Sequence, residues 1–285
     1  DWLPFDTAEW NIDVEGAKRK IRDAKPSLII LGASFYLFPH PTREMREAAD
    51  DVGSAIVYDG AHVLGLIAGK EWPNPLERGA DILTGSTHKS FPGPQKGIVL
   101  SNDSEMLQRV RMTIYPGMLT NHHLMNVAAL GYAMLEFLDF GEAYARQVVR
   151  NAKALAESLH EHGLDVIGER NGYTRSHQVL VRTHPSMQGA EAARLLDRAN
   201  IVCNKMELEN ANGLRIGTSE ATRVGMKESE MKEVARFIAE VVVFKKDPPL
   251  VARKVRTFVK DYARVEYSYE RGRNPYAFPL LAGRR

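Results

Sequence analysis

The sequence lacks the features that mark disulfide-linked, membrane-spanning and nucleic-acid-binding proteins. Its 285 residues contain one cysteine, Cys203, so no disulfide can form within the chain. We therefore expect a reducing, cytoplasmic location. No run of apolar residues approaches the roughly 18 that a membrane helix needs, so no membrane partner is expected. The formal net charge is only +2, and the absence of a long run of like charges argues against a nucleic-acid partner.

The amino-terminal stretch has no basic region followed by an apolar one, so it is not predicted to be a signal peptide. It also lacks an initiator methionine, and we expect the chain to begin partway through a longer protein. We find no internal repeat and no low-complexity segment. The composition, with 44% hydrophobic and 26% charged residues, is that of a globular protein with one large or two modest domains.

What the chain does contain is an alternation of helical and apolar segments. Buried strands are predicted over residues 27–34, 54–61, 80–86 and 97–101, and helices over 14–24 and 42–53. In the second helix, Thr42 is predicted as the N-cap and Gly53 as the stop. Strands that alternate with helices indicate an α/β fold, with a mostly parallel sheet flanked by helices.

The pattern changes from about His122 onward. Residues 126–163 are predicted to form one long helix that Gly163 ends. Shorter strands and helices follow, which is typical of a smaller α+β domain. We therefore predict a large domain over residues 1–138 and a carboxy-terminal small domain over residues 139–285.

Several reactive side chains follow the predicted strands. In open α/β sheets, ligands bind beyond the carboxyl ends of the strands. The side chains expected to meet there are Ser34, Asp59, His62, Ser86, Thr87, His88 and Lys89. One carboxylate, two imidazoles, one amine and several hydroxyls would converge on one site.

This set suits pyridoxal 5′-phosphate. A partly desolvated lysine such as Lys89 presents the amine that the aldehyde of this cofactor needs for a Schiff base. Asp59 would keep the pyridine nitrogen protonated, and His62 would stack on the ring or touch its phenolic oxygen. The residue types and their spacing are also compatible with a simpler interpretation. In it, Lys89 is a solvated surface lysine and Asp59-Gly60 forms a turn.

Four separated motifs then resemble the serine hydroxymethyltransferase family, whose members are fold-type I pyridoxal-phosphate enzymes. They are DGAHVLGLIA, THKSFPGPQKG, EAYARQVVRNAKALAESLHEHG and NGLRIGTSEATRVGMKESEM, in the family's order. The resemblance covers nearly the whole chain. It implies an incomplete fold-type I large domain followed by the small domain.

The resemblance implies a role for each candidate residue. Lys89 would hold the cofactor covalently, Asp59 would pair with the pyridine nitrogen, and His62 and His88 would contact the ring. Thr87 would help to exchange lysine for substrate. The remaining implied contacts are Ser34 and Ser86 near the phosphate or ring, and Arg215 on the substrate carboxylate.

The sequence also departs from the family. The family's amino-terminal portion, which carries its acid–base glutamate, precedes the segment seen here. A Gly-Gly-Pro loop is replaced by YPGMLTNHHLMN, where Thr120, Asn121 or His122 would have to substitute. In the folate-contacting stretch the chain has MELENANG, and Glu207 and Glu209 would repel a folate's glutamate tail.

The resemblance implies a transferase of one-carbon metabolism, which cleaves serine to glycine and passes the one-carbon unit to tetrahydrofolate. The altered folate stretch keeps a folate-independent threonine aldolase or transaldolase open as the alternative. A catalytically impaired, truncated paralogue is a third interpretation. A small amino acid is the expected substrate, and a homodimer or homotetramer is the expected assembly. No metal site is expected, because adjacent histidines such as His122 and His123 do not face the same way on a helix.

Overall fold

The computed structural model describes residues 1–208 and 211–277, which pack as two compact units. The first unit holds residues 1–146 and 168–177, and the second holds residues 147–167 and those described from 178 onward. Residues 168–177 therefore pack with the first unit, although both of their neighbours in sequence belong to the second. The domain division predicted after residue 138 stays a prediction, and the packing units change at residue 146.

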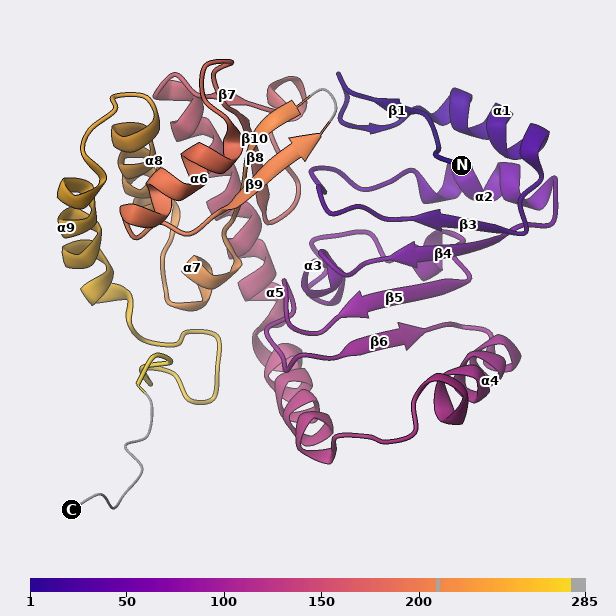
Figure 1. The fold of residues 1–285 in the computed structure, drawn as a ribbon. Helices are drawn as coiled ribbons and strands as arrows, with labels where there is room; N and C mark the ends of the chain where they lie inside the picture. Colours follow the sequence, from indigo (N-terminus) through magenta and orange to yellow (C-terminus); the bar gives the residue numbers. More distant parts are fainter. Residues whose placement is uncertain (209–210, 278–285) are drawn as a thin grey trace. The chain divides into compact units, whose positions relative to one another are not determined.

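The first unit is built on a four-stranded sheet (Figure 1). The strands of this sheet are β3 (Leu28–Leu31), β4 (Ala55–Asp59), β5 (Ile82–Ser86) and β6 (Gly97–Leu100). The unit also holds β1 (Phe5–Asp6) and β2 (Asn11–Ile12), which pair in a separate antiparallel sheet of two strands. The helices of the first unit are α1 (Val14–Ala24), α2 (Thr42–Asp50), α3 (Leu64–Ala68) and α4 (Ser104–Met112), with short helical turns over Pro75–Arg78, Thr113–Met118 and Glu169–Asn171. The order of the four-stranded sheet is β3-β4-β5-β6, with β3, β4 and β5 parallel and β6 antiparallel to β5.

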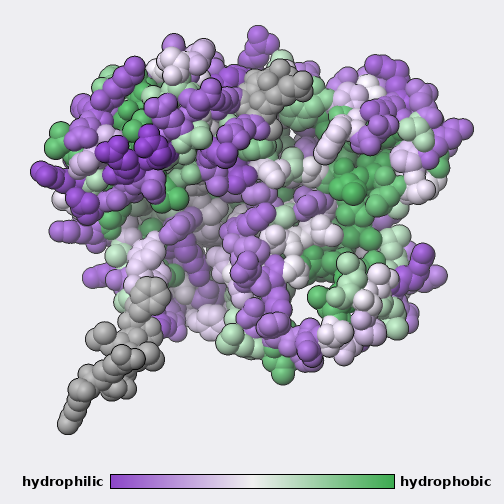
Figure 2. Space-filling view, in the orientation of Figure 1, coloured by the Kyte–Doolittle hydropathy of each residue, from purple (hydrophilic) through white to green (hydrophobic). Residues whose placement is uncertain are grey.

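The two faces of this sheet differ. One face is buried and carries Ile29, Leu31, Ile56, Tyr58 and Leu83. On the other face, two side chains of β3 are exposed, at 47% for Leu28 and 64% for Ile30. Figure 2 shows hydrophobic surface over β3 and β4. The prediction that residues 27–34 form a buried strand is therefore wrong for this face, because an apolar run does not reveal which faces other elements cover.

Helix starts follow capping chemistry where a short polar side chain is placed to accept. Asp13 caps α1 by accepting a hydrogen bond from the Gly16 amide at 3.1 Å. The prediction that Thr42 is the N-cap of α2 is wrong. Pro41 occupies that position, Thr42 is the first helical residue, and its hydroxyl donates to the His40 carbonyl at 3.3 Å. The helix ends at Asp50, shortly before Gly53.

The long helix predicted over residues 126–163 is confirmed as α5 (Leu124–Glu161). Gly163 follows it with φ +84°, a conformation that glycine adopts at helix ends. By length and composition alone, α5 is long and apolar enough to cross a membrane, although no membrane helix is predicted from the apolar runs of the sequence. Only 22% of its most apolar window is buried, whereas its later turns bury residues such as Val148, Ala152 and Leu155.

The second unit packs helices on an antiparallel sheet of order β7-β8-β10-β9. Its strands are β7 (Asp165–Val166), β8 (Gln178–Arg182), β9 (Asn204–Leu208) and β10 (Ala211–Gly217). Its helices are α6 (Gly189–Arg198), α7 (Ser219–Arg223), α8 (Glu228–Val242) and α9 (Pro248–Phe258), followed by a short turn over Val259–Tyr262. Leu180, Val181, Leu196, Leu214 and Ile238 form its core.

A cluster of aromatic side chains lies in the first unit, after β3. The ring centroids of Tyr36 and His40 are 4.5 Å apart, and the Tyr36 hydroxyl lies 3.3 Å from His40 Nδ1. Trp72 Nε1 donates to the Tyr58 hydroxyl at 3.0 Å. Burial lowers the pKa of His40 to about 4, so this imidazole is neutral at physiological pH.

The stability of the protein is expected to fall below pH 6.5 because of His40. The unfolded chain protonates this imidazole near pH 6.5 and the folded chain only near pH 4. Unfolding therefore takes up a proton between these values, and the loss of stability totals at most about 3 kcal/mol, since the ring keeps partial exposure. Urea unfolding of His40→Gln at pH 7, 5.5 and 4.5 should show a flatter pH dependence than the wild type. An equally steep dependence would contradict this, and exposed His184→Gln serves as the control.

Candidate functional site

The predicted site residues start from three neighbouring strand ends. In the β4–β5 register, Asp59 lies opposite Thr84, two residues before β5 ends at Ser86. Gly32 directly follows β3, and a Cβ placed there would come within 2.6 Å of the Asp59 Cβ. Only glycine permits this close approach, so the turn after β3 packs directly on the end of β4.

Asp59 contacts the chain through one hydrogen bond and makes the smallest contribution to the pKa of Tyr36. Its Oδ1 accepts a hydrogen bond from the Ala61 amide at 2.9 Å, as in a turn that aspartate stabilises. Burial, Tyr58 and the Asp59 charge together hold the pKa of Tyr36 well above its usual range, so its phenol stays protonated. The turn interpretation of Asp59 is therefore correct as far as it goes, and its side chain is exposed at the sheet edge.

The structure brings Lys89 and His62 together. The Lys89 Nζ lies 3.3 Å from His62 Nε2, although the two residues are 27 positions apart in sequence. His62 precedes α3, and Lys89 follows β5. Lys89 is exposed and His62 half-buried, so the amine is accessible while its imidazole neighbour is partly enclosed.

Thr87 performs a structural task in this loop. Its side chain is only 1% exposed, and its hydroxyl lies 2.6 Å from the Pro94 carbonyl and 3.1 Å from the Lys96 carbonyl. Its own carbonyl accepts from the Gly93 amide at 2.8 Å. Thr87 thus fixes the turn that follows Lys89. The predicted role in exchanging lysine for substrate stays a prediction, and the hydroxyl proton is engaged within this turn.

The other predicted residues of the first unit lie on the same loops. Ser34 is exposed on the loop after β3, Ser86 is half-buried at the end of β5, and His88 is exposed beside Lys89. Their predicted contacts with a cofactor stay predictions. Thr120, Asn121 and His122 are exposed before α5, and a phosphate contact from them is likewise untested.

Arg215 belongs to the second unit. It lies on β10, where its Nη2 donates to Asn204 Oδ1 at 3.1 Å. Desolvation lowers the pKa of Arg215 below its ordinary value. In the altered folate stretch, Lys205 and Glu207 form an exposed ion pair at 2.8 Å, and Glu209 lies outside the described residues. The role of Arg215 as a carboxylate clamp stays a prediction.

Sequence reasoning missed His177. It ends the segment 168–177, which packs in the first unit. Its ring lies parallel to that of His62, at an angle of 10° and a centroid distance of 6.0 Å. A histidine before a predicted strand gave only a weak signal, because more than a hundred residues separate it from His62.

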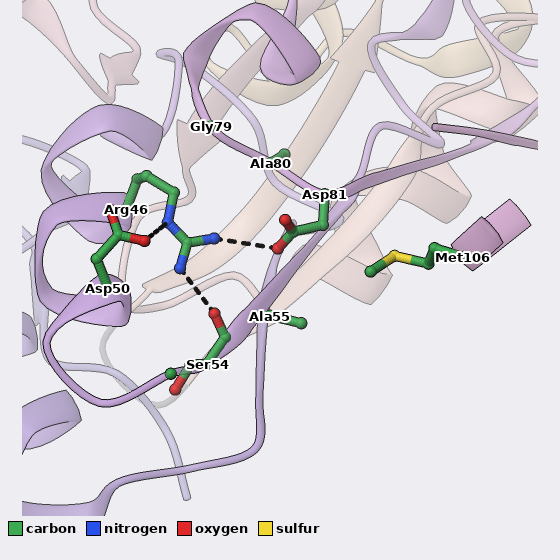
Figure 3. Close-up of a pocket in the computed structure, with 9 residues that line it drawn as sticks. Arg46, Asp50, Ser54, Ala55, Gly79, Ala80, Asp81 and Met106 are labelled. Atoms are coloured by element: carbon green, nitrogen blue, oxygen red, sulfur yellow. Dashed lines mark hydrogen bonds and ion pairs between the residues drawn. The ribbon is translucent and has the colours of Figure 1, made fainter. Parts of the chain in front are cut away.

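An open hollow lies at the other end of the same strands. It has a volume of about 500 Å³ and is lined by residues that include Arg46, Asp50, Ser54 and Asp81 (Figure 3). Arg46 donates to the Ser54 carbonyl at 2.7 Å and to Asp81 Oδ2 at 3.1 Å, and it pairs with Asp50 at 2.8 Å. Ser54 and Asp81 precede β4 and β5, whereas the predicted site residues follow these strands. We therefore assign the hollow a structural role.

Gly65 sets the position of the loop that carries Lys89. Its amide donates to Ser90 Oγ at 3.1 Å, and an added Cβ would lie 2.2 Å from the Ser90 carbonyl oxygen. We expect Gly65→Ala to destabilise the protein by about 2–3 kcal/mol, because backbone cannot yield as a flexible side chain can. Gly131→Ala is the control, since nothing lies within 4 Å of a Cβ there. Urea unfolding that ranks the two variants equally would contradict the close packing of α3 on this loop.

Comparison with known proteins identifies the family of this chain. The profile of the serine hydroxymethyltransferase family matches residues 4–238. The chain belongs to the serine hydroxymethyltransferase family. The resemblance of its four motifs is thereby confirmed.

Similar proteins support the same assignment. The chain is 48% identical over 276 residues to a serine hydroxymethyltransferase from Staphylothermus marinus, and 49% identical over 283 residues to one from Thermococcus kodakarensis. Each match covers 94% of this chain, and they cover 63% and 65% of those relatives. The chain therefore spans just under two thirds of the length of these family members.

A solved structure confirms the fold. The L-threonine transaldolase from Pseudomonas fluorescens, crystallised in its internal aldimine state, superposes with a TM-score of 0.88 at 35% identity. The match covers 94% of this chain and 63% of that one. The predicted fold class, α/β with a mostly parallel sheet and a smaller α+β part, is confirmed.

Proposed function

We propose that this family member acts in the pyridoxal-phosphate-dependent cleavage of serine to glycine, with transfer of the one-carbon unit to tetrahydrofolate. The observation that carries the proposal is the contact of 3.3 Å between Lys89 Nζ and His62 Nε2, inside two family motifs. An accessible amine beside an imidazole, at the carboxyl end of a parallel sheet, is suited to covalent cofactor chemistry.

The donor set at this edge fits pyridoxal phosphate. When bound, this cofactor supplies an electron sink for the bond that breaks at the amino acid. Lys89 would hold its aldehyde carbon, Asp59 would hold the proton at its pyridine nitrogen, and His62 would orient both the amine and the ring. Ser34, Ser86 and His88 would add polar contacts around it. Arg215 would bind the amino-acid carboxylate with its planar fork.

Charge near the folate stretch favours a second candidate. Glu207 is exposed on β9, and a carboxylate there repels the glutamate tail of a folate. A transaldolase acting on threonine without folate would meet no such penalty, and the similar Pseudomonas fluorescens protein is an L-threonine transaldolase. The assembly that we propose for either activity is a homodimer or homotetramer.

The two candidates separate in one assay. Glycine formation is measured from serine with and without tetrahydrofolate, and from threonine. Serine cleavage that depends on tetrahydrofolate supports the hydroxymethyltransferase. Rapid threonine cleavage with no folate dependence supports the aldolase or transaldolase. Absence of both activities, together with no visible absorbance on adding pyridoxal phosphate, would support an impaired paralogue.

Arg215→Ala should raise the amino-acid KM by about tenfold to a hundredfold, because a charged hydrogen-bonded pair contributes about 1.5–3 kcal/mol. The cofactor spectrum without amino acid should not change. Steady-state kinetics and absorbance spectra measure the two quantities. A changed spectrum in the absence of substrate would mean that Arg215 contacts the cofactor instead. Arg182→Ala, at an arginine that pairs with Asp165 on neighbouring strands, is the control.

A further inference from the structure

The segment 168–177 is anchored to the loop that follows β3. The Arg175 amide donates to the Leu37 carbonyl at 2.8 Å, and Ser176 Oγ donates to the Tyr36 carbonyl. The Ser176 amide donates in turn to Thr174 Oγ1 at 2.9 Å. The Arg175–Leu37 contact joins two backbone groups, and the Ser176 side chain adds a second contact to the backbone of the loop. The segment is thus held at two consecutive residues just before His177.

This anchoring places His177 next to the predicted site. The residues Thr174 and Ser176 are fully buried, and His177 is only 7% exposed. Its ring faces that of His62 at 6.0 Å between centroids and 10° between planes. The distance and angle fall in the range of offset-stacked ring pairs. A buried ring on an anchored backbone thus meets the half-buried ring that contacts Lys89.

The arrangement restricts the rotation of His62. An imidazole on a half-buried side chain has several rotamers available, and only some keep Nε2 within reach of the Lys89 amine. A fixed parallel ring on one side favours the rotamer in which the two planes match. We infer that His177 is a positioning residue, which holds the imidazole of His62 against Lys89. Its consequence for catalysis rests on the proposed function, but the side-chain geometry does not.

The first test uses the full chain without cofactor. At pH 8.5, brief acetylation with acetic anhydride is followed by mass spectrometry of the peptide that contains Lys89. An amine engaged in a hydrogen bond with an imidazole is less free to attack the anhydride, so His62→Ala should speed labelling of Lys89 about threefold to tenfold. His177→Ala should speed it similarly, and the double variant should be no faster than either single variant.

Two further variants separate positioning from a general loss of structure. His177→Phe retains a flat ring and should restore labelling close to the wild-type rate. His184→Ala removes an exposed imidazole that contacts Ser186, and it should change nothing. Thermal unfolding of each variant confirms that it is folded. Additive effects of His62→Ala and His177→Ala, or a His177→Phe variant that labels as fast as His177→Ala, would overturn the inference.

The second test measures the affinity of the same proteins for pyridoxal phosphate by absorbance. His177→Ala should raise the dissociation constant about fivefold in the wild-type background and less than about twofold in the His62→Ala background. A wild-type chain that binds no pyridoxal phosphate would count against the proposed function alone, because the labelling test still decides the role of His177. Equal effects in both backgrounds would count against His177 acting through His62.

Discussion

Lys89→Ala should abolish cleavage of amino acids, with a loss on the order of a thousandfold or more, as expected when the covalent group of an active site is removed. The cause is chemical, because no other side chain at the carboxyl end of β5 is predicted to offer an amine to the cofactor aldehyde. The visible absorbance that develops with pyridoxal phosphate in the wild type should be lost as well. Activity and absorbance are measured on the same preparations.

Two controls make this result specific. Lys89→Arg keeps a positive charge beside His62 but cannot form an imine, so it should be as inactive as Lys89→Ala. Lys70→Ala removes an exposed lysine that pairs with Glu142, and it should retain full activity. If Lys89→Arg keeps substantial activity, the amine contributes charge rather than covalent chemistry, and the proposed function fails.

Asp59→Asn should slow catalysis by about a hundredfold or more, while the affinity for pyridoxal phosphate changes by less than about tenfold. The substitution is unusually clean, because an asparagine side-chain oxygen can still accept the hydrogen bond from the Ala61 amide. The turn is therefore kept and the negative charge is removed. In the role proposed for Asp59, loss of that charge would leave the proton on the pyridine nitrogen unstabilised, and the cofactor would be a weaker electron sink.

The measurement compares kcat with the dissociation constant of the cofactor. Asp59→Ala is the matched variant, since it removes both the charge and the acceptor for Ala61. It should therefore lose stability in urea unfolding as well as activity. Equal losses in rate and affinity for Asp59→Asn would mean that Asp59 binds the cofactor without tuning it, contrary to the role proposed here.

Local patterns predicted much of the fold. The strands β4 and β5 follow from short apolar runs that end in polar residues, and the ends of α5 follow from its helical spacing and Gly163. Thr42 was misplaced because a threonine before a helical pattern fits both the N-cap and the first turn, and Pro41 decided between them. The exposed face of β3 was missed because periodicity does not show what covers a strand.

The sequence predicts the site residues that stand at strand ends but not those that tertiary packing brings to the site. Lys89, Asp59 and His62 stand at strand ends, where topology alone predicts that ligands bind. His177 is placed by hydrogen bonds from the Arg175 amide to the Leu37 carbonyl and from the Ser176 hydroxyl to the Tyr36 carbonyl, which tertiary packing sets. The task of Thr87 in bracing its turn likewise depends on the carbonyls of Pro94 and Lys96, whose direction no residue pattern gives.

The central claim is that the Lys89 amine holds the cofactor. Reduction of the wild-type chain with borohydride in the presence of pyridoxal phosphate, followed by peptide mapping, tests it most directly. A stable pyridoxyl adduct should form at one position, Lys89. An adduct that forms instead at a neighbour such as Lys96, or cleavage of serine by a chain that gives no adduct at Lys89, would contradict the account.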